Sequence, residues 1–193
     1  MRIRERLVAA IVTTVSVAVV ASSQFAGAAS ADNTYGEFLV GGKIEEAYLA
    51  TGGAATWGNP TGPELSAGLG GRFQRFEKDT SFYWKASVAG GTAHQVGGAI
   101  LRKWGTKRWE RGPLGYPLTD EQDAAGKGKR QQFQGGNVYY SKNNGTFVVW
   151  GMLLGVWARK GGPGGFFGMP VSDEYRVGKK WAQDFSGGTL FWP

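Results

Sequence analysis

LGYPLTDE at residues 114–121 and FGMPVSDE at residues 167–174 are two versions of one pattern, and WGNPTGPE at residues 57–64 is a looser third version. A phenylalanine follows each version and opens a stretch that ends in an aromatic residue. The turn prolines of successive versions are 57 and 53 residues apart, and the phenylalanines are 57 and 52 residues apart. Because two independent anchors keep nearly one period, the sequence predicts three tandem repeats.

Each predicted repeat opens with a short helix. An apolar pair four residues apart follows the opening glycine: Ile44 and Tyr48, Ile100 and Trp104, Leu153 and Trp157. Residues at this spacing lie on one face of a helix, and we interpret the stripe as core packing. Glycines at positions 52–53, 105 and 161–162 are expected to end the three helices.

A turn and a β-hairpin complete each repeat. In the turn, glycine supplies a backbone conformation that other residues avoid, and proline sets the exit direction. KRQQFQGGNVYYS at 129–141 indicates two strands joined at a glycine pair, as does KKWAQDFSGGTLFW at 179–192. The first repeat has Lys78 and Asp79 at this place, so its hairpin turn must differ.

The predicted fold class is therefore α+β, with three tandem repeats of short helix, LGxP turn and β-hairpin, in units at about 38–93, 94–147 and 148–193. HQVGG at 94–98 and FVVWG at 147–151 indicate a third strand after a hairpin. FLVGG at 38–42 resembles that strand, whereas the last hairpin is followed by none. We expect strand 38–40 to close onto the last hairpin, since closure removes exposed sheet edges. An open arc is the alternative.

Residues 1–31 are typical of a secretory signal peptide. The basic start MRIRER is followed by an apolar stretch of fifteen residues and then by small residues. That stretch is short for a bilayer span, which needs about 20 residues. We favour cleavage after Ala31 over cleavage after Ala28, and an uncleaved N-terminal anchor is the alternative. Residues 32–193 then form one secreted domain, extracellular or associated with the cell wall.

Composition narrows the function classes. The chain has no cysteine, which excludes thiol catalysis and thiolate metal sites. Its 33 glycines and 8 tryptophans indicate tight turns around a small aromatic core. The net charge of +7 falls to about +5 without residues 1–31, and a mild basic excess suits an anionic surface such as a cell wall. Because Lys and Arg are scattered, we expect no nucleic-acid partner, and after signal cleavage no membrane partner.

Few residues are available for catalysis. His94 is the single histidine, and no Gly-x-Ser-x-Gly nucleophile motif occurs. A zinc site needs several histidine, cysteine or carboxylate ligands. Two carboxylates of the glycosidase type must face each other, and the acidic pairs 120–121 and 173–174 are sequence neighbours. We predict no enzyme, no catalytic residues, no cofactor and no metal, with a small wall hydrolase as the least favoured alternative.

The sequence resembles the LGFP repeat. The resemblance rests on three patterns taken together: G-x-I-x3-W, L-G-x-P-x-[ST]-D-E and F-x-G-G-x-x-[YF]-[YW]. The resemblance extends over about residues 38–193 and is closest at 114–121 and 167–174; the version at 57–64 lacks the Ser/Thr-Asp pair. It implies a noncatalytic module of secreted and envelope proteins of Gram-positive bacteria, which holds proteins at the wall by binding polysaccharide such as arabinogalactan. Family members often carry an enzyme beside the repeats. This chain reads as signal plus repeats, which favours a free-standing binder, a wall-structural protein or a partner of another envelope protein.

Glycan binding uses aromatic rings that stack on sugars and polar groups that bind their hydroxyls. Three aromatic residues between helix and turn are predicted to be partly exposed for this purpose: Trp57, Trp109 and Tyr116. The polar candidates are Glu64, Asp120, Glu121, Asp173 and Glu174, for which turn and helix capping is the other interpretation. We expect a cell-envelope protein that binds wall polysaccharide through several weak sites. The alternative is a module that binds another secreted envelope protein.

Overall fold

The computed structural model describes residues 33–193, so the predicted signal peptide lies outside the described residues. The helices are α1 (Gly42–Ala50), α2 (Gly53–Trp57), α3 (Gly98–Thr106) and α4 (Gly151–Arg159), and the 3₁₀ turns are η1 (Gly68–Gly70), η2 (Ala89–Gly91), η3 (Trp109–Arg111) and η4 (Gly162–Gly164). No helix among residues 33–193 is long and apolar enough to cross a bilayer.

The strands form four antiparallel sheets, which together with the helices confirm the α+β class. The small N-terminal sheet pairs β1 (Asn33–Tyr35) with β2 (Phe38–Val40). The second sheet contains β3 (Leu65–Ser66), β4 (Arg72–Phe76), β5 (Thr80–Trp84) and β6 (His94–Gly97) in that order. The third contains β7 (Gln122–Asp123), β8 (Lys129–Phe133), β9 (Gly136–Ser141) and β10 (Gly145–Trp150), and the last contains β11 (Tyr175–Val177), β12 (Lys180–Phe185) and β13 (Gly188–Trp192).

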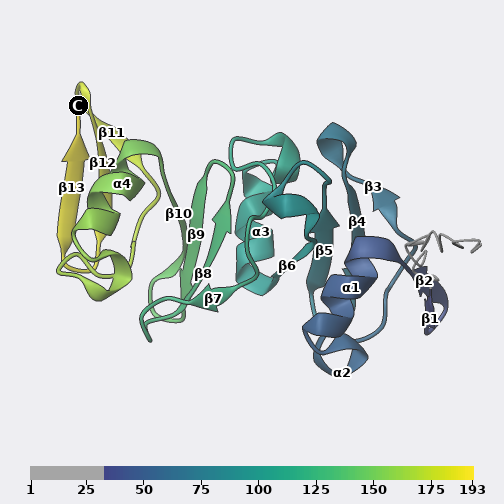
Figure 1. Cartoon of the computed structure of the whole chain (residues 1–193). Helices are drawn as coiled ribbons and strands as arrows, with labels where there is room; N and C mark the ends of the chain where they lie inside the picture. The colour runs from purple at the N-terminus through teal and green to yellow at the C-terminus, as the bar shows by residue number, and fades with distance from the viewer. Residues whose placement is uncertain (1–32) are drawn as a thin grey trace, which may run out of the picture.

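Helices and sheets alternate along an elongated molecule, as Figure 1 shows. The helix α3 lies between two sheets, because its buried Ile100 and Trp104 share one core cluster with Tyr83 of β5 and Val138 of β9. In the same way α4 shares a cluster with β9, β10, β12 and β13, and α1 packs on β4 and β5. The predicted apolar pairs of all three helices are buried, so their interpretation as core is confirmed.

One aromatic ring on each of these helices packs between two others. It stacks or tilts against the phenylalanine that follows the turn, with ring centroids 4.7, 5.2 and 5.1 Å apart for Tyr48–Phe76, Trp104–Phe133 and Trp157–Phe185. It meets a tyrosine edge-on at 5.2, 4.6 and 4.9 Å in Tyr35–Tyr48, Tyr83–Trp104 and Tyr139–Trp157. Each of the three larger sheets thus contributes a ring to the helix before it, and the first three sheets also contribute one to the helix after them.

The turns also recur in the structure. Each turn proline forms a bridge with its phenylalanine, in the pairs Pro60–Phe76, Pro117–Phe133 and Pro170–Phe185. The hairpin of β4 and β5 differs as predicted, because Lys78 and Asp79 take positive φ angles of 58° and 54°. The third strands predicted at 94–98 and 147–151 are present as β6 and β10.

Two sequence predictions about the fold are wrong. Strand β2 does not close onto the last hairpin, because it pairs with β1, and Figure 1 shows β2 and β13 at opposite ends of the molecule. Three helices and the sheets between them separate those ends, so the chain is open. Gly105 does not end α3 either: the left-handed residue that follows this helix is Arg108, at φ 72°.

Candidate functional site

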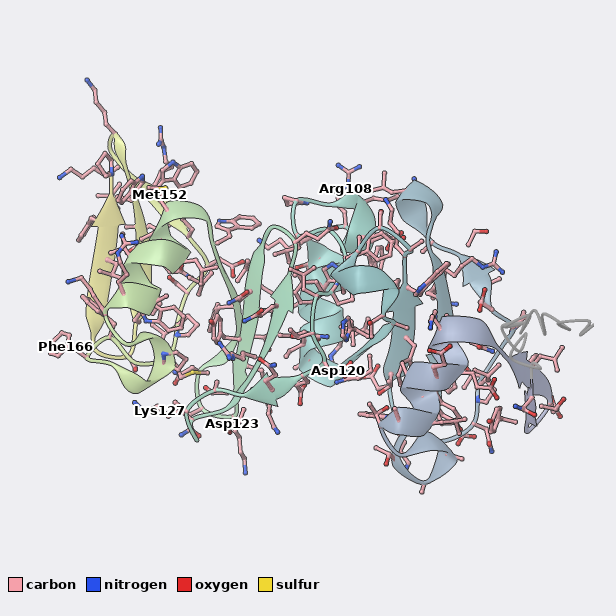
Figure 2. All side chains as sticks on the ribbon, viewed as in Figure 1. Arg108, Asp120, Asp123, Lys127, Met152 and Phe166 are labelled. Carbon is pink, nitrogen blue, oxygen red and sulfur yellow. The ribbon has the colours of Figure 1, made fainter. Side chains whose placement is uncertain are left out.

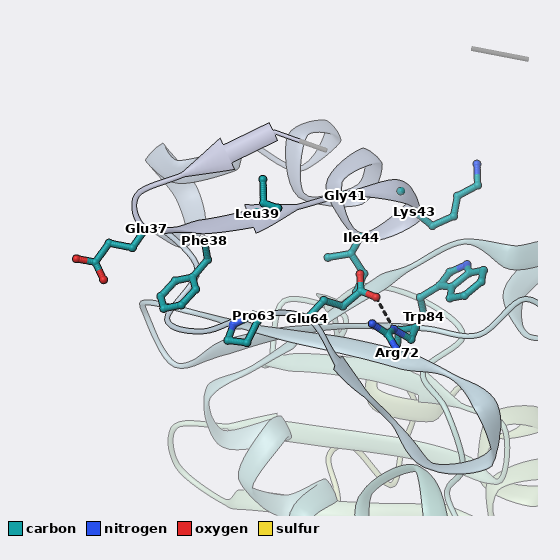
Figure 3. Close-up of a pocket in the computed structure, with 11 residues that line it drawn as sticks. Glu37, Phe38, Leu39, Gly41, Lys43, Ile44, Pro63, Glu64, Arg72 and Trp84 are labelled. Atoms are coloured by element: carbon teal, nitrogen blue, oxygen red, sulfur yellow. Dashed lines mark hydrogen bonds and ion pairs between the residues drawn. The ribbon is translucent and has the colours of Figure 1, made fainter. Parts of the chain in front are cut away.

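A hollow of about 700 Å³ lies between the second sheet and the β2–α1 segment. It contains Glu64, Arg72 and Trp84, with β2 and the start of α1 across from them, as Figure 3 shows. We call it the Glu64 hollow. Arg72 Nε donates a hydrogen bond to Glu64 Oε1, and Arg72 and Trp84 are directly opposed on β4 and β5. The hollow therefore presents a carboxylate, a guanidinium and an aromatic ring together.

Strand alternation places Arg72 at this position. Arg72, Gln74 and Phe76 lie on one face of β4, because successive side chains point to opposite faces. Gln74 and Phe76 are buried beneath α1 and β2, while Arg72 is only half-buried at the open end of the row. The same row therefore supplies both core and site.

A second hollow, of about 420 Å³, recurs one repeat later and contains Glu121, Lys129 and Tyr140. We call it the Glu121 hollow. Lys129 and Tyr140 are opposed on β8 and β9, as Arg72 and Trp84 are on β4 and β5. Trp57 forms a further wall; its Nε1 donates to Thr51 Oγ1 at 2.8 Å. The structure thus brings together two predicted site residues, Trp57 and Glu121.

Glu121 lies at the mouth of its hollow. Its surface is exposed, yet the surrounding protein removes enough water to raise the pKa of the carboxyl group. The charge of Lys129 lowers that pKa and partly offsets the effect. The result is a carboxylate beside a cation and an aromatic ring, a set that can bind hydroxyl groups while a sugar ring stacks on Tyr140.

Glu174, the third glutamate of the series, has different neighbours. Trp150 Nε1 donates to its Oε2 at 2.8 Å. The position of Arg72 and Lys129 is occupied by Trp181, which is opposed by Trp192 on β13. Trp181 is 38% exposed, and the guanidinium of Arg176 lies 4.6 Å from the centroid of its ring. This third position is therefore more aromatic than the first two.

Asp120 and Asp173 connect neighbouring layers. Asp120 accepts hydrogen bonds from Gln95 N at 3.0 Å and is 3.2 Å from His94 Nδ1. Asp173 accepts from Val148 N at 3.0 Å and forms ion pairs with Lys103 and Lys107. Burial alone would raise the pKa of Asp173, but the hydrogen bonds from Lys103, Val148 N and Lys107 lower it. These contacts fit the structural interpretation of both aspartates.

The prediction that Tyr116 is partly exposed is wrong. Its side chain is only 1% exposed, because Gly115 takes a left-handed φ of 66° and the ring turns into the core. Its hydroxyl donates to the Gly68 carbonyl, and burial raises its pKa to about 12. Tyr116 therefore cannot stack on a ligand at the surface.

Trp109 is 50% exposed, as predicted. It does not lie in either hollow described above but borders a separate one, against β4 and β5. Glycan candidates from the sequence are thus distributed over several places rather than gathered in one cleft.

Sequence reasoning missed four residues of the two recurring hollows: Arg72, Trp84, Lys129 and Tyr140. The available signal was the strand pattern, since a basic residue stands four positions before Phe76 and Phe133 and an aromatic residue closes each hairpin. Among residues 33–193, no three His, Cys, Asp or Glu side chains are close enough to hold a metal ion.

Comparison with known families gives one result. A family model described as LGFP repeat matches residues 58–112 and 114–165 as two tandem copies. Both matches begin at or beside the glycine-proline turn, so each contains one of the paired sets just described: Glu64, Arg72 and Trp84 in the first, and Glu121, Lys129 and Tyr140 in the second. No curated protein matches the chain.

Proposed function

Since the chain belongs to the LGFP repeat family, we propose that it is a secreted, noncatalytic protein of the cell envelope that binds wall polysaccharide, arabinogalactan-like in kind. The observation that carries this proposal is the recurrence of one chemical set, carboxylate, cation and aromatic ring, in the Glu64 and Glu121 hollows.

This set suits a sugar. The ring of Trp84 or Tyr140 stacks on the apolar face of a saccharide, and the adjacent carboxylate and cation bind its hydroxyls. Each hollow is open to solvent, which favours weak binding at each site. A polymer engages both hollows on one chain, so avidity makes up for the weak affinity of each site.

We further propose three structural units, at about 38–93, 94–147 and 148–193. The bridge between Pro170 and Phe185 and the stacking of Trp157 on Phe185 support the third unit, because they repeat contacts of the first two. In this unit Trp181 and Trp192 replace the basic–aromatic pair, so we expect it to bind sugar by stacking more than by charge.

The candidate carboxylates also support a noncatalytic role. Glu64 is paired with Arg72, Glu174 accepts from Trp150, and Asp173 is held by two lysines. Each is engaged in a contact that fixes a binding surface or joins two layers. We propose that these groups bind and position without transferring protons.

The test is co-sedimentation of residues 32–193, which contain every helix and strand described, with insoluble wall stripped of protein. We expect binding that persists at high salt and weakens in Trp84→Ala and Tyr140→Ala. The matched control is Phe166→Ala, because Phe166 is 80% exposed and lines neither hollow. Binding lost to salt alone would reduce the interaction to basic charge on an anionic wall.

A protein-interaction module is the second candidate. Phe191 on β13 occupies the position that Tyr83 and Tyr139 hold in the two preceding sheets. Those tyrosines are covered by α3 and α4, whereas Phe191 is 53% exposed. A secreted partner that supplies a strand followed by a helix with an aromatic residue would cover it in the same way. Retention on such a partner without binding to protein-free wall would favour this function.

A further inference from the structure

Two residues that follow α3 adopt a backbone conformation that favours glycine. After each of α1, α3 and α4, the helix-capping residue is followed by two residues with left-handed backbone angles. In two of these three cases both residues are glycines: Gly52–Gly53 after α1, at φ 112° and 54°, and Gly161–Gly162 after α4, at φ 92° and 54°. After α3 the pair is Arg108–Trp109, at φ 72° and 48°. Non-glycine residues are strained in this region, and such strain concentrates at functional sites.

The strain places a tryptophan beside a hollow of about 700 Å³, which we call the Trp109 hollow. One wall consists of Phe73 and Tyr83, whose rings stack with centroids 5.2 Å apart and planes 11° apart. Trp109 and Leu101 also line the hollow. The Trp109 ring lies over Gly105, where even a Cβ atom would come within 3.2 Å of the indole. The glycine inside α3 therefore makes room for the ring.

Glu110, which lines this hollow, is held in place by a contact with Gly68 in η1 of the preceding repeat, and Tyr116 contacts the same glycine. Glu110 Oε1 accepts from Gly68 N at 2.5 Å, and Tyr116 donates its hydroxyl hydrogen to Gly68 O. Two side chains thus fix both backbone groups of one glycine. A lining residue that is held this way loses little conformational entropy when a ligand binds.

The accessible charge in the hollow is positive. Arg75 lies with its guanidinium carbon 5.0 Å from the centroid of Phe73, and no carboxylate within residues 33–193 forms an ion pair with it. The second arginine, Arg102, pairs with Asp79. The carboxylate of Glu110 also lines the hollow, but it is buried and its Oε1 already accepts from Gly68 N. Arg108, the residue before Trp109, extends outward in Figure 2.

We propose that the Trp109 hollow binds an acidic sugar, with the sugar ring stacked on Trp109 and its carboxylate or phosphate group bound by Arg75. The inference rests on the proposed glycan binding. It adds the chemical class of the ligand, an acidic sugar, at a place where the other repeats have no equivalent ring. The glycine pairs after α1 and α4 provide no ring at the equivalent position, so within residues 33–193 the other two helices have no counterpart of Trp109 there.

The test measures binding of three probes to residues 32–193 by titration calorimetry: a uronic acid disaccharide, a hexose 1-phosphate and a neutral disaccharide of the same linkage as the first. We expect an acidic probe to bind, and the neutral disaccharide to bind at least about tenfold more weakly at this hollow, since the guanidinium contact is lost. Preference for the uronic acid or for the phosphate identifies which acid group the hollow takes. Equal binding of acidic and neutral probes would overturn the proposal.

Two variants locate the binding. Trp109→Gly is expected to abolish binding of the acidic probe and to raise the melting temperature, because it restores the glycine found in the other two repeats. Arg75→Gln is expected to remove the preference for acidic over neutral probes without changing the melting temperature. Unchanged acidic binding in both variants would contradict the proposal. Trp84→Ala with Tyr140→Ala is the control that keeps acidic binding while removing wall binding, so failure of this inference and failure of the proposed function are distinguishable.

Discussion

The side-chain Nε2 of Gln131 donates a hydrogen bond to the backbone carbonyl of Gln95, 36 residues earlier in the chain, at 2.6 Å. The same nitrogen donates to Thr119 O at 2.8 Å. One buried amide group therefore joins three segments: the strand β8, the edge strand β6 of the preceding sheet, and the turn of its own repeat. Gln74 and Gln183 make the equivalent pairs of bonds, to Leu39 and Gly62 and to Val148 and Ser172.

We predict that Gln131→Leu lowers the free energy of unfolding by about 2–3 kcal/mol, because two buried carbonyls lose their donor. The measurement is urea unfolding. Gln132→Leu is the control: its side chain lies on the other face of β8 and forms no such bonds, so we expect less than about 1 kcal/mol. Equal destabilisation by the two variants would refute the joining role of Gln131.

Asp173→Asn should destabilise the protein in a pH-dependent manner. The pKa of Asp173 is lowered in the folded state, so its ionised form contributes stability at pH values above its ordinary pKa of 3.8. That contribution is lost as pH falls through the folded pKa. We expect the variant to lose about 1–2 kcal/mol of its free energy of unfolding at pH 7. This loss should shrink below pH 3.8. A difference independent of pH would contradict the role of the lysine pairs.

Glu121→Gln should act in the opposite direction. The pKa of Glu121 is raised, mainly by partial burial, so its ionised form is disfavoured in the folded state above that pKa. We expect the variant to be more stable at pH 7 by a few tenths of a kcal/mol, about 1 at most. The gain should vanish below the ordinary glutamate pKa of 4.5. Thermal melts at pH 4 and pH 7 check this sign.

Tyr116→Phe separates structure from binding. The substitution removes the hydroxyl that donates to Gly68 O and leaves the buried ring in place. We expect the protein to lose about 1 kcal/mol of stability and to keep its affinity for wall. Weaker wall binding in a fully folded variant would restore Tyr116 as a ligand-binding residue.

Much of the fold could be predicted from the sequence, because local chemistry determines it. The i,i+4 pairs such as Ile100 and Trp104 marked the helices, and the glycine-proline turns marked the hairpins. Closure could not be judged in this way, because it depends on how three layers stack in space. The edge of β2 is also occupied by β1, a strand of three residues without a strong pattern.

The site was predicted only in part. Glu64 and Glu121 were found because they repeat in sequence, but the pairs Arg72–Trp84 and Lys129–Tyr140 depend on cross-strand register. Register brings residues together that are eleven or twelve positions apart, and a sequence pattern gives no direct signal of it. Tyr116 was misplaced for a related reason, since the direction of its ring follows from the left-handed Gly115.

The measurement that tests the central claim most directly is amide chemical-shift mapping of isotope-labelled residues 32–193, titrated with oligosaccharides released from protein-free wall. We predict shifts that cluster around Glu64, Arg72 and Trp84 and around Glu121, Lys129 and Tyr140, with similar midpoints at the two places. Shifts confined to the sheet of β11–β13, or no shifts at saturating oligosaccharide, would contradict glycan binding at the recurring hollows.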